Sequence, residues 1–474
     1  MDTITGKILK LHNWPDGRII GIAKRIGETL GEQGFDREKV LARLDAVRQN
    51  PGPFLADELM ADLARECIHI IQKDVESAAE ELRESPLSYP VWGREYIEDG
   101  SIVQMDNAMR LPISVAGALM PDAHVGYGLP IGGVLATDNA VIPYAVGVDI
   151  ACRMRLSLYE VSPTLLGQKK HMFEDALMDN TAFGVGAQWK GSDRADHEVL
   201  DESTWKATRL LTTLKDNAAR QLGTSGTGNH FVEWGSFRLY EPLFGLQPGE
   251  YLALLSHSGS RSVGFKIADR YSKLAMEKHP DLDKSVRHLA WLSLDSEEGQ
   301  EYWLSMELAG RFASANHYII HQRVAKAVGL KKAAVVENHH NFAWAEKLPD
   351  GRDVIVHRKG ATPAGAGVLG VIPGSMGDAG YVVRGRGVSE SLESASHGAG
   401  RLMSRKAALQ SISKAARDEY LKERGVTLLG GGMDESPQAY KPIDSVIAAQ
   451  QDLVDVLGKF NPRIVRMANE AGDI

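Results

Sequence analysis

Near the start of the chain, apolar residues recur every three or four positions, which is the period of a helix buried along one face. The pattern predicts helices over Gly17–Gly31, over Asp36–Asn50 and along a longer apolar stripe from Leu59 to Ile71. Asp36 is a residue type that caps helix starts, because its side chain accepts a hydrogen bond from a free backbone N–H. Cys67 lies on the third stripe, so we expect it to be a small core residue. Together these segments predict an N-terminal helical extension over residues 1–85.

Beyond about residue 90, short apolar runs separated by glycine-containing loops predict strands, with amphipathic helices between them. The predicted strands are Ala140–Val148, Tyr251–Ser256, Ala333–Glu337, Asp353–His357 and Tyr381–Val383. The predicted helices are Ser203–Leu222, Phe265–Glu277, Glu297–Val328, Ser404–Glu423 and Ile443–Leu457. Because strands and helices do not alternate regularly, we expect a mixed α+β domain over residues 86–474 rather than a doubly wound parallel sheet.

The apolar stretch Val141–Cys152 ends in an aspartate, Asp149, and a cysteine, Cys152. Its pattern predicts a buried strand that presents a carboxylate and a thiol on a rigid base. Only two cysteines occur in the 474 residues, so a disulfide framework is not expected and a reducing cytoplasm is the simpler location.

Composition narrows the class of protein without naming a function. Hydrophobic residues make up 43% and charged residues 24%, which is ordinary for a soluble globular protein. A formal charge of −8 argues against a surface that coats nucleic acid. No apolar run is long enough to span a membrane, so no membrane is expected as a partner. Lys and Arg nevertheless outnumber Asp and Glu between Arg352 and Arg424. This local excess fits a groove for a polyanion, but a basic solvated face is an equally open interpretation.

Several histidines and Cys152 stand beside glycines or at the ends of predicted strands, where their side chains are free to meet. Four of these residues and one aspartate form a candidate metal site: Asp149, Cys152, His230, His257 and His340. One thiolate, one carboxylate and three imidazoles can hold two divalent ions if the sulfur bridges them, and Mn²⁺ or Zn²⁺ accepts this mixture. No short-range zinc-binding spacing is present, so the site would have to be assembled by folding. His317 and His321 lie one helical turn apart, but their apolar flanks favour a buried helix face.

Two glycine-rich segments, Pro373–Gly377 and His397–Arg401, are candidates for cradling phosphates with backbone N–H groups, with tight turns as the alternative. The Lys-x-Asp-Gly arrangement common in nucleotidyl-transferring ligases is absent, since Lys347–Gly351 has a different spacing. If the chain carries a nucleotide covalently, another nucleophile is required. An imidazole can attack phosphorus, which makes His397 the candidate, and Arg401 is placed to offset charge in the transition state.

Taken together, nine segments resemble the RtcB-type RNA-splicing ligases in identity and in order, over about residues 90–467. They are Met120–Gly128, Gly147–Cys152, Gly226–Glu233, His257–Arg261, His339–Asn341, Arg358–Ala361, Pro373–Gly377, His397–Arg401 and Asp434–Lys441. The resemblance implies a GTP- and Mn²⁺-dependent ligase that joins an RNA 2′,3′-cyclic phosphate or 3′-phosphate end to a 5′-hydroxyl end. It also implies that an archease-like activator is a possible partner.

The resemblance assigns roles to individual residues. It implies that His397 becomes guanylylated, and that two Mn²⁺ ions are held by the five residues of the candidate metal site. The implied nucleotide contacts are Asn229, His230, Phe231, Val232, Glu233, His340, Asn341, Pro373, Gly374, Ser375, Met376, His397, Gly398, Ala399, Gly400 and Arg401.

Departures from the family pattern keep other functions open. Ala151 replaces a usual glycine, and a terminal Lys-Gly that contacts GTP in the family is missing, with Arg466 as a possible substitute. The first 85 or so residues are extra relative to compact bacterial members, so the chain looks like a divergent bacterial-type paralogue. Two alternatives therefore remain beside the ligase. One is a metal-dependent phosphoesterase acting on RNA ends without guanylylation, and the other is a non-catalytic RNA-end binding protein.

Overall fold

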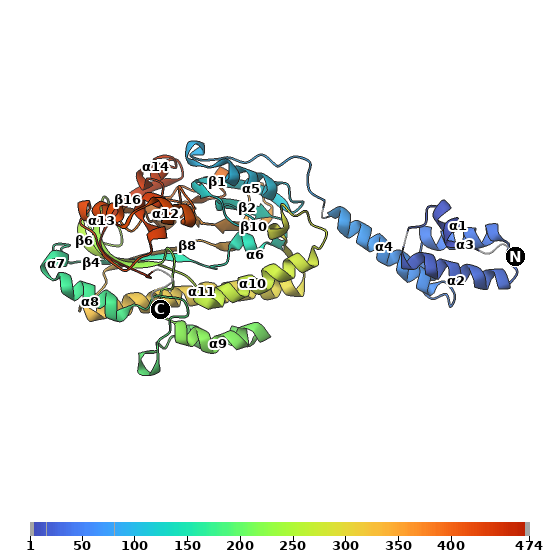
Figure 1. The fold of residues 1–474 in the computed structure, drawn as a ribbon, viewed down its shortest axis with the longest axis horizontal. Coiled ribbons are helices and arrows are strands. Elements are labelled where there is room, and N and C mark those ends of the chain that lie inside the picture. The colour runs from blue at the N-terminus through green and yellow to red at the C-terminus, as the bar shows by residue number, and fades with distance from the viewer. Residues whose placement is uncertain (1–3, 16, 80, 470–474) are drawn as a thin grey trace. The chain divides into compact units, whose positions relative to one another are not determined.

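The structure, a computed structural model, describes residues 4–15, 17–79 and 81–469 (Figure 1). Its internal contacts divide the chain into two compact units, Met1–Leu82 and Arg83–Ile474. The sequence had placed this boundary near residue 85. We describe each unit by itself.

The first unit is a small helical body. Its helices are α1 (Gly6–Leu11), α2 (Arg18–Glu32), α3 (Arg37–Gln49) and α4 (Ala61–Ala79). The three predicted helices are confirmed, and the Asp36 side chain accepts a hydrogen bond from the Lys39 backbone N–H at 2.9 Å, as its capping role requires. Cys67 is buried in the core that these helices share, which confirms its packing role.

The second unit is built on two antiparallel sheets. The smaller has the order β1-β2-β10-β9, and the larger has the order β12-β13-β16-β5-β6-β4-β8, with β15 paired to β16 in parallel. The strands of the smaller sheet are β1 (Ser114–His124), β2 (Ile131–Thr137), β9 (Phe342–Lys347) and β10 (Asp353–Lys359). Those of the larger sheet are β4 (Arg153–Tyr159), β5 (Phe231–Leu239), β6 (Gly249–Ser258), β8 (Ala334–His339), β12 (Leu369–Ile372), β13 (Gly380–Gly385), β15 (Thr427–Leu429) and β16 (Val454–Met467).

The larger sheet curls until its two end strands nearly meet. The Asn338 side chain on β8 donates to the Val371 carbonyl of β12 at 3.4 Å and accepts from the Val371 N–H at 2.8 Å. A side chain thus fills the place of a strand-to-strand ladder at this gap. Two short pairs, β3 (Ala140–Val141) with β7 (Leu292–Ser293) and β11 (Ala361–Pro363) with β14 (Ser394–Ser396), complete the strand structure. The mixed α+β prediction is confirmed.

Helices cover the larger sheet on one face, where α10 and α11 run side by side (Figure 1). The helices of this unit are α5 (Asp99–Met109), α6 (Pro143–Val146), α7 (Leu165–Gln168), α8 (Lys170–Asn180), α9 (Arg209–Gln221), α10 (Arg261–Lys278), α11 (Glu297–Ala327), α12 (Arg405–Ser411), α13 (Lys414–Glu423) and α14 (Ile443–Ala448). Trp234 on β5 packs against Phe173 of α8 and Ile320 of α11 in one buried cluster. Within the described residues, no helix is both long and apolar enough to cross a membrane.

The predicted strand over Ala140–Val148 is wrong in its second half, and with it the prediction of one buried strand over Val141–Cys152. The strand β3 ends at Val141, and Pro143 opens the helical turn α6. Proline has a fixed φ and no N–H to donate, so it suits the first position of a helix better than a sheet interior. Gly147, with φ 101°, ends that turn, and the next strand begins only at Arg153.

Three predicted helices are shorter than expected. Ser404–Glu423 is two helices, because the Ser413 side chain caps α13 by accepting from the Ala416 N–H at 3.2 Å. Ile443–Leu457 holds helix only as far as Ala448, since Val454 begins the long strand β16. Ser203–Leu222 starts with a separate 3-10 turn, Ser203–Lys206, before α9.

Candidate metal and nucleotide site

Strand register brings four predicted metal ligands to one edge of the larger sheet. Cys152 directly precedes β4, His230 directly precedes β5, His257 is near the end of β6, and His340 directly follows β8. In the sheet order β5-β6-β4-β8, Phe231 pairs with His257, Met154 pairs with His257, and Arg153 pairs with His339. Antiparallel neighbours alternate start and end at the same edge, so residues far apart in sequence meet there.

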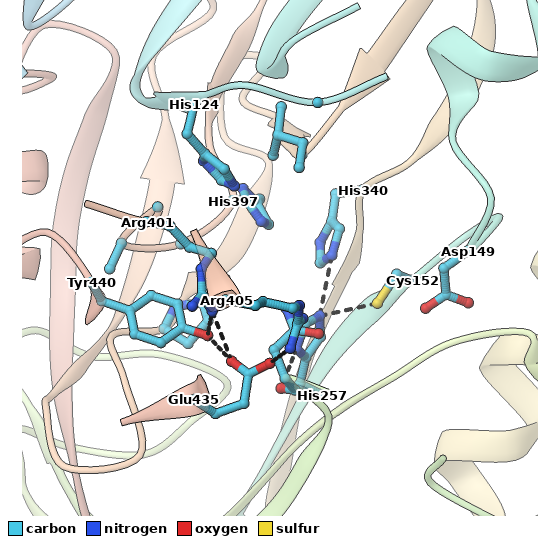
Figure 2. A pocket seen from close by; sticks show the side chains of 18 of the residues that line it. His124, Asp149, Cys152, His257, His340, His397, Arg401, Arg405, Glu435 and Tyr440 are labelled. Atoms are coloured by element: carbon cyan, nitrogen blue, oxygen red, sulfur yellow. Dashed lines mark hydrogen bonds and ion pairs between the residues drawn. The ribbon is translucent and has the colours of Figure 1, made fainter. Parts of the chain in front are cut away.

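The ligand atoms of these residues converge. The Cys152 Sγ lies 3.0 Å from His257 Nε2 and 3.4 Å from His230 Nε2. His257 Nε2 lies 3.3 Å from His340 Nε2, and His230 Nε2 lies 2.9 Å from Asp149 Oδ2. We call these five residues the metal-ligand cluster: Asp149, Cys152, His230, His257 and His340. Figure 2 shows His340 above His257 and Cys152 to the right of His257, with Asp149 beyond Cys152.

Backbone carbonyls fix the orientation of two of the rings. The Ser225 carbonyl lies 2.7 Å from His230 Nδ1, and the Asn229 carbonyl lies 3.1 Å from His257 Nδ1. A carbonyl only accepts, so Nδ1 of His257 carries the proton and its Nε2 presents a lone pair to the cluster. This is the arrangement of a histidine that binds a metal through Nε2. His230 differs, because its Nδ1 also lies 3.1 Å from the Arg261 guanidinium and its Nε2 lies against the Asp149 carboxylate.

The charges of the metal-ligand cluster call for a cation. Burial would raise the pKa of Asp149, but the hydrogen bond and charge of His230 and the charge of Arg261 outweigh burial and lower it to about 2. Burial and the neighbouring Asp149 raise the pKa of the Cys152 thiol, and burial lowers the pKa of His257 to about 3. A divalent ion would offset the cost of burying a thiolate, because it stabilises that form of Cys152 and binds neutral imidazoles. The donor set therefore fits a metal ion, and among the described residues the ligand atoms of Cys152, His230 and His257 lie close enough together to share one.

His397 stands on the opposite wall, in a glycine loop after β14. Its Nδ1 lies 2.7 Å from the Oδ2 of Asp122, and the backbone N–H groups of His397 and Gly398 donate to the same oxygen at 3.2 and 3.4 Å. The carboxylate accepts a hydrogen bond from the Nδ1–H group, which leaves Nε2 unprotonated and free as a nucleophile. The His397 and His340 rings are 4.8 Å apart, so the loop adjoins the metal-ligand cluster.

Asp122 is fully buried, and its ionised form is held by its neighbours. Burial would raise the pKa of Asp122, but the hydrogen bond from His397 and the charges of His397 and Lys441 outweigh burial and lower it. Lys441 Nζ donates to the Pro121 and Ala123 carbonyls at 3.1 and 2.7 Å, which fastens the segment on both sides of the aspartate. Asp122 is therefore placed to orient His397 and to favour positive charge on its ring.

A single pocket of about 760 Å³ joins the metal-ligand cluster to the His397 loop. Most of the predicted site residues line it: Asp149, Cys152, Asn229, Phe231, His257, His340, Asn341, Pro373, Gly374, Ser375, Met376, His397, Gly398, Ala399, Gly400 and Arg401. Three predicted residues do not. His230 reaches the cluster from behind, Val232 packs into the core beside Trp234, and Glu233 is buried with a pKa that burial raises. A volume of this size suits a nucleotide-sized ligand.

Basic side chains line the same pocket, and they differ in how far they are engaged. The Arg401 guanidinium donates to Glu435, to the Asp434 carbonyl at 2.7 Å and to the Met403 carbonyl at 3.0 Å. Arg405 is half-exposed and pairs with Asp434 and Glu435 (Figure 2). Arg401 thus stabilises the loop, while Arg405 reaches further into the open part of the pocket.

Lys359 is the basic residue with the fewest contacts. Its side chain is buried, burial lowers its pKa to about 7, and Nζ donates to the Tyr127 carbonyl. Among the described residues, no carboxylate forms an ion pair with it within 4.0 Å. A Cβ on the next residue, Gly360, would lie 3.1 Å from His397 Cε1, so the backbone beside Lys359 adjoins the nucleophile, and both side chains line the same pocket. An anion beside His397 would stabilise its ammonium form.

Comparison with known proteins assigns the chain to a family. A family model described as tRNA-splicing ligase RtcB matches residues 104–468. The chain is 34% identical over 393 residues to RNA-splicing ligase RtcB of Escherichia coli K12, covering 76% of this chain and 92% of the relative. It is 32% identical over 436 residues to tRNA-splicing ligase RtcB of Nanoarchaeum equitans, covering 77% and 91%.

The chain belongs to the RtcB family. RNA-splicing ligase RtcB of Mycobacterium tuberculosis is a further relative, 33% identical over 417 residues, covering 73% of this chain and 95% of the relative. The family match includes every residue of the metal-ligand cluster and the His397 loop, and it begins beyond the first compact unit.

Two departures from the RtcB pattern have visible consequences. Ala151 adopts a left-handed backbone with φ 56°, a conformation that costs an ordinary L-residue energy and explains why glycine is usual there. Near the C-terminus, Met467 lines the pocket, whereas the Arg466 guanidinium donates to the Leu429 carbonyl at 3.1 Å and lies over the Phe183 ring. Arg466 is thus held away from the pocket lining.

Two residues of the site were not singled out by sequence. Asp122 lies within the segment Met120–Gly128, which carries part of the resemblance, but no role was predicted for the aspartate itself. Lys359 lies within Arg358–Ala361, where nothing local shows that its buried side chain lines the same pocket as His397. The pair His317 and His321 is buried on α11, and both rings bond to the Ser256 hydroxyl at 2.7 and 2.8 Å, which confirms the helix-face interpretation.

Proposed function

We propose that this RtcB-family protein is an RNA ligase that joins a 3′-phosphate or 2′,3′-cyclic phosphate end to a 5′-hydroxyl end through a guanylylated histidine. The observation that carries the proposal is the pair His397–Asp122 on the wall of a pocket whose floor is the metal-ligand cluster. The relatives named above are RNA-splicing and tRNA-splicing ligases, which supports the same reaction class.

In the proposed first step, His397 Nε2 attacks the α-phosphorus of GTP. A nitrogen–phosphorus bond forms, the bond to the β-phosphate oxygen breaks, and pyrophosphate leaves. Asp122 accepts the hydrogen bond from Nδ1 throughout, so the positive charge that develops on the ring is offset by a buried carboxylate 2.7 Å away. The proposed guanylylation thus uses His397 as nucleophile and Asp122 as its positioning residue.

In the proposed later steps, a phosphate oxygen of the RNA 3′-end attacks the guanylylated phosphorus, and His397 leaves. The 5′-hydroxyl then attacks the activated 3′-phosphate, and GMP departs as the new phosphodiester forms. A 2′,3′-cyclic phosphate would first be opened by water to the 3′-phosphate. Lys359, buried in the pocket that His397 also lines, is placed to bind a phosphate oxygen, which would restore the positive charge that burial disfavours.

The metal-ligand cluster is proposed to hold Mn²⁺, for which Asp149, Cys152, His230, His257 and His340 would supply the ligands. When bound, such ions neutralise charge on reacting phosphates and orient the attack. Two histidines are oriented by the protein: the His257 Nδ1–H donates to the Asn229 carbonyl and so presents Nε2, and His230 Nε2 lies 2.9 Å from the Asp149 carboxylate. Gly259 leaves room for the carboxylate, since a Cβ there would lie 2.2 Å from Asp149 Oδ1.

The proposed nucleotide contacts are those predicted residues that line the pocket, in particular Asn229, Phe231, Asn341, Pro373–Met376 and His397–Gly400. Asn341 also ties the two walls together. Its Oδ1 accepts from the Gly360 N–H at 2.8 Å, and its backbone carbonyl accepts from the Ala151 N–H at 2.9 Å. We therefore expect Asn341 to fix the pocket shape as well as to face the nucleotide.

The proposal is tested by incubating the protein with Mn²⁺ and α-labelled GTP and examining the protein for an acid-labile, alkali-stable label. The wild type and a His171→Ala control, which changes an exposed histidine, should be labelled, and His397→Ala should not. Equal labelling of His397→Ala would overturn the mechanism. Release of RNA phosphate without any labelled protein would favour the phosphoesterase, and RNA-end binding without turnover would favour the binding protein.

A further inference from the structure

Tyr127 presents an exposed aromatic ring at the pocket. It lies in the loop between β1 and β2, and it lines the pocket while 71% of the residue is exposed. Large aromatic rings are normally buried, so a ring left in solvent beside an active site suggests a contact with a ligand. Neither the proposed nucleotide contacts nor the metal-ligand cluster uses Tyr127.

The backbone beneath this ring is held firmly. The Gln104 side chain pairs with both backbone groups of Gly126, accepting from its N–H at 3.0 Å and donating to its carbonyl at 2.5 Å. The Glu98 carboxylate accepts from the Val125 N–H at 2.9 Å, and Lys359 donates to the Tyr127 carbonyl. The loop is thus fixed by three side chains, and the Tyr127 ring projects from it.

Two further rings extend this surface. The His288 ring meets Tyr127 edge-on, with centroids 6.1 Å apart and an interplanar angle of 82°. The same His288 ring meets Tyr144 of α6 at 5.1 Å and 69°. Tyr144 also lines the pocket. The three rings come from three separate segments, and we call them the aromatic shelf: Tyr127, Tyr144 and His288.

The aromatic shelf is tied to the reacting atoms through Lys359. Its ammonium holds the carbonyl of Tyr127, and the residue after it packs against the His397 ring. An RNA phosphate placed at Lys359 and His397 would therefore carry its nucleoside toward the Tyr127 side of the pocket. A flat apolar base is the part of that nucleoside which an aromatic face binds, whatever its sequence.

We propose that the aromatic shelf binds the RNA strand by stacking, with Tyr127 against the base of the nucleotide that carries the 3′-phosphate. The inference rests on the proposed function, because it takes RNA ends as the substrate. Stacking on a pre-fixed ring costs little ordering of the protein and is tolerant of base identity. The shelf would therefore select a single-stranded, unstacked end rather than a sequence.

The test is a binding cycle with an RNA oligonucleotide that ends in a 3′-phosphate, with its last nucleotide either intact or abasic. Fluorescence anisotropy measures the dissociation constants for the wild type, Tyr127→Ala and Tyr127→Trp. Phe244→Ala is the matched control, since Phe244 is 55% exposed and does not line the pocket. Removing the base should weaken wild-type binding by about tenfold, and Tyr127→Ala should weaken binding of the intact RNA by a similar factor.

Coupling between the two changes is decisive. Removing the base should change the affinity of Tyr127→Ala by less than about twofold, and Tyr127→Trp and Phe244→Ala should behave like the wild type. Equal effects of base removal on the wild type and Tyr127→Ala would overturn the inference. The same cycle is run with a second RNA that has a 5′-hydroxyl end and an intact or abasic first nucleotide, and coupling with this RNA alone would also overturn it. The binding cycle needs no GTP, so its outcome is independent of the labelling experiment. If the wild type takes up no label from GTP but base removal and Tyr127→Ala are still coupled, the proposed guanylylation is refuted and the aromatic shelf is not.

Discussion

At the floor of the pocket, the metal-ligand cluster sits at the ends of hydrogen-bonded strands, whereas on the wall His397 sits in a loop held by side chains. Register places Cys152, His257 and His340 together without any contact between their own side chains being needed. On the wall, by contrast, Asp122 must reach His397 through a single carboxylate oxygen. The floor is specified by backbone pairing and is proposed to hold a cation, while the wall is specified by the buried pair of Asp122 and His397.

The largest expected effect comes from removing the sulfur of the floor. Cys152→Ala should reduce ligation by at least about 10³-fold, because a proposed metal ligand is lost. Folding should change little, since the side chain's close partners, His230 and His257, are fellow ligands. Thermal unfolding with and without Mn²⁺ gives a second readout. The wild type should be stabilised by the metal and the variant should not, and a normal Mn²⁺ response in Cys152→Ala would contradict the assignment.

On the wall, Asp122→Asn should slow guanylylation by about 10²- to 10⁴-fold without removing the nucleophile. The amide does not stabilise the positive charge on the ring, and it permits the wrong tautomer of His397. The rate of label uptake from GTP measures this step, and Mn²⁺ stabilisation should remain that of the wild type because Asp122 is outside the metal-ligand cluster. Wild-type labelling in Asp122→Asn would refute the positioning role.

Lys359→Met should separate function from stability. Loss of the ammonium should weaken binding of the RNA 3′-phosphate by about tenfold or more, since a charged hydrogen bond is lost. Stability should change in the opposite sense. The folded pKa of about 7 lies below the ordinary value of 10.5, so the cost of burying the charge is full below pH 7 and declines as the pH rises toward 10.5.

Denaturant unfolding at several pH values checks this sign. Lys359→Met should be more stable than the wild type by about 1–3 kcal/mol at pH 6, and the difference should shrink above pH 7. Lys359→Arg serves as the control, because it retains a cation at all these pH values. A destabilised Lys359→Met at pH 6 would show that the ammonium stabilises the fold instead.

The smallest effect is expected at Ala151, within the turn of the floor. Its φ of 56° suits glycine, so Ala151→Gly should stabilise the protein by about 0.5 kcal/mol, the relief of strain being partly offset by greater freedom of the unfolded chain. The midpoint of chemical unfolding measures this change. A loss of stability would mean that contacts of the Ala151 methyl group outweigh the backbone strain.

Local patterns predicted much of the fold. The helical unit, the long helix α11 and most strands follow from apolar periodicity, and the mixed α+β class is confirmed. The strand over Ala140–Val148 failed because a short buried turn and a buried strand have the same apolar composition. Pro143 was the residue that distinguished them. The half-helix at Ile443–Leu457 failed where β16 takes over, because pairing with β5 and β13 is a long-range property.

The site was predictable as residue types and not as geometry. Asp149, Cys152 and the three histidines were chosen for their chemistry, but their convergence depends on the order β5-β6-β4-β8, which no local pattern encodes. Lys359 was missed because its importance lies in burial within the pocket that His397 lines. Asp122 was missed because an aspartate near the end of a strand is ordinary until its partner is known. Tertiary proximity, rather than composition, gives both residues their chemistry.

The central claim is that His397 on the wall carries the nucleotide, and locating the adduct tests it most directly. The protein is incubated with Mn²⁺ and GTP and the reaction is then quenched at alkaline pH. Peptide mass spectrometry should find one GMP bound to the peptide that contains His397. The adduct should disappear when RNA with a 3′-phosphate is added before the quench. An adduct on a lysine, or sealed RNA formed with no adduct on His397, would contradict the account.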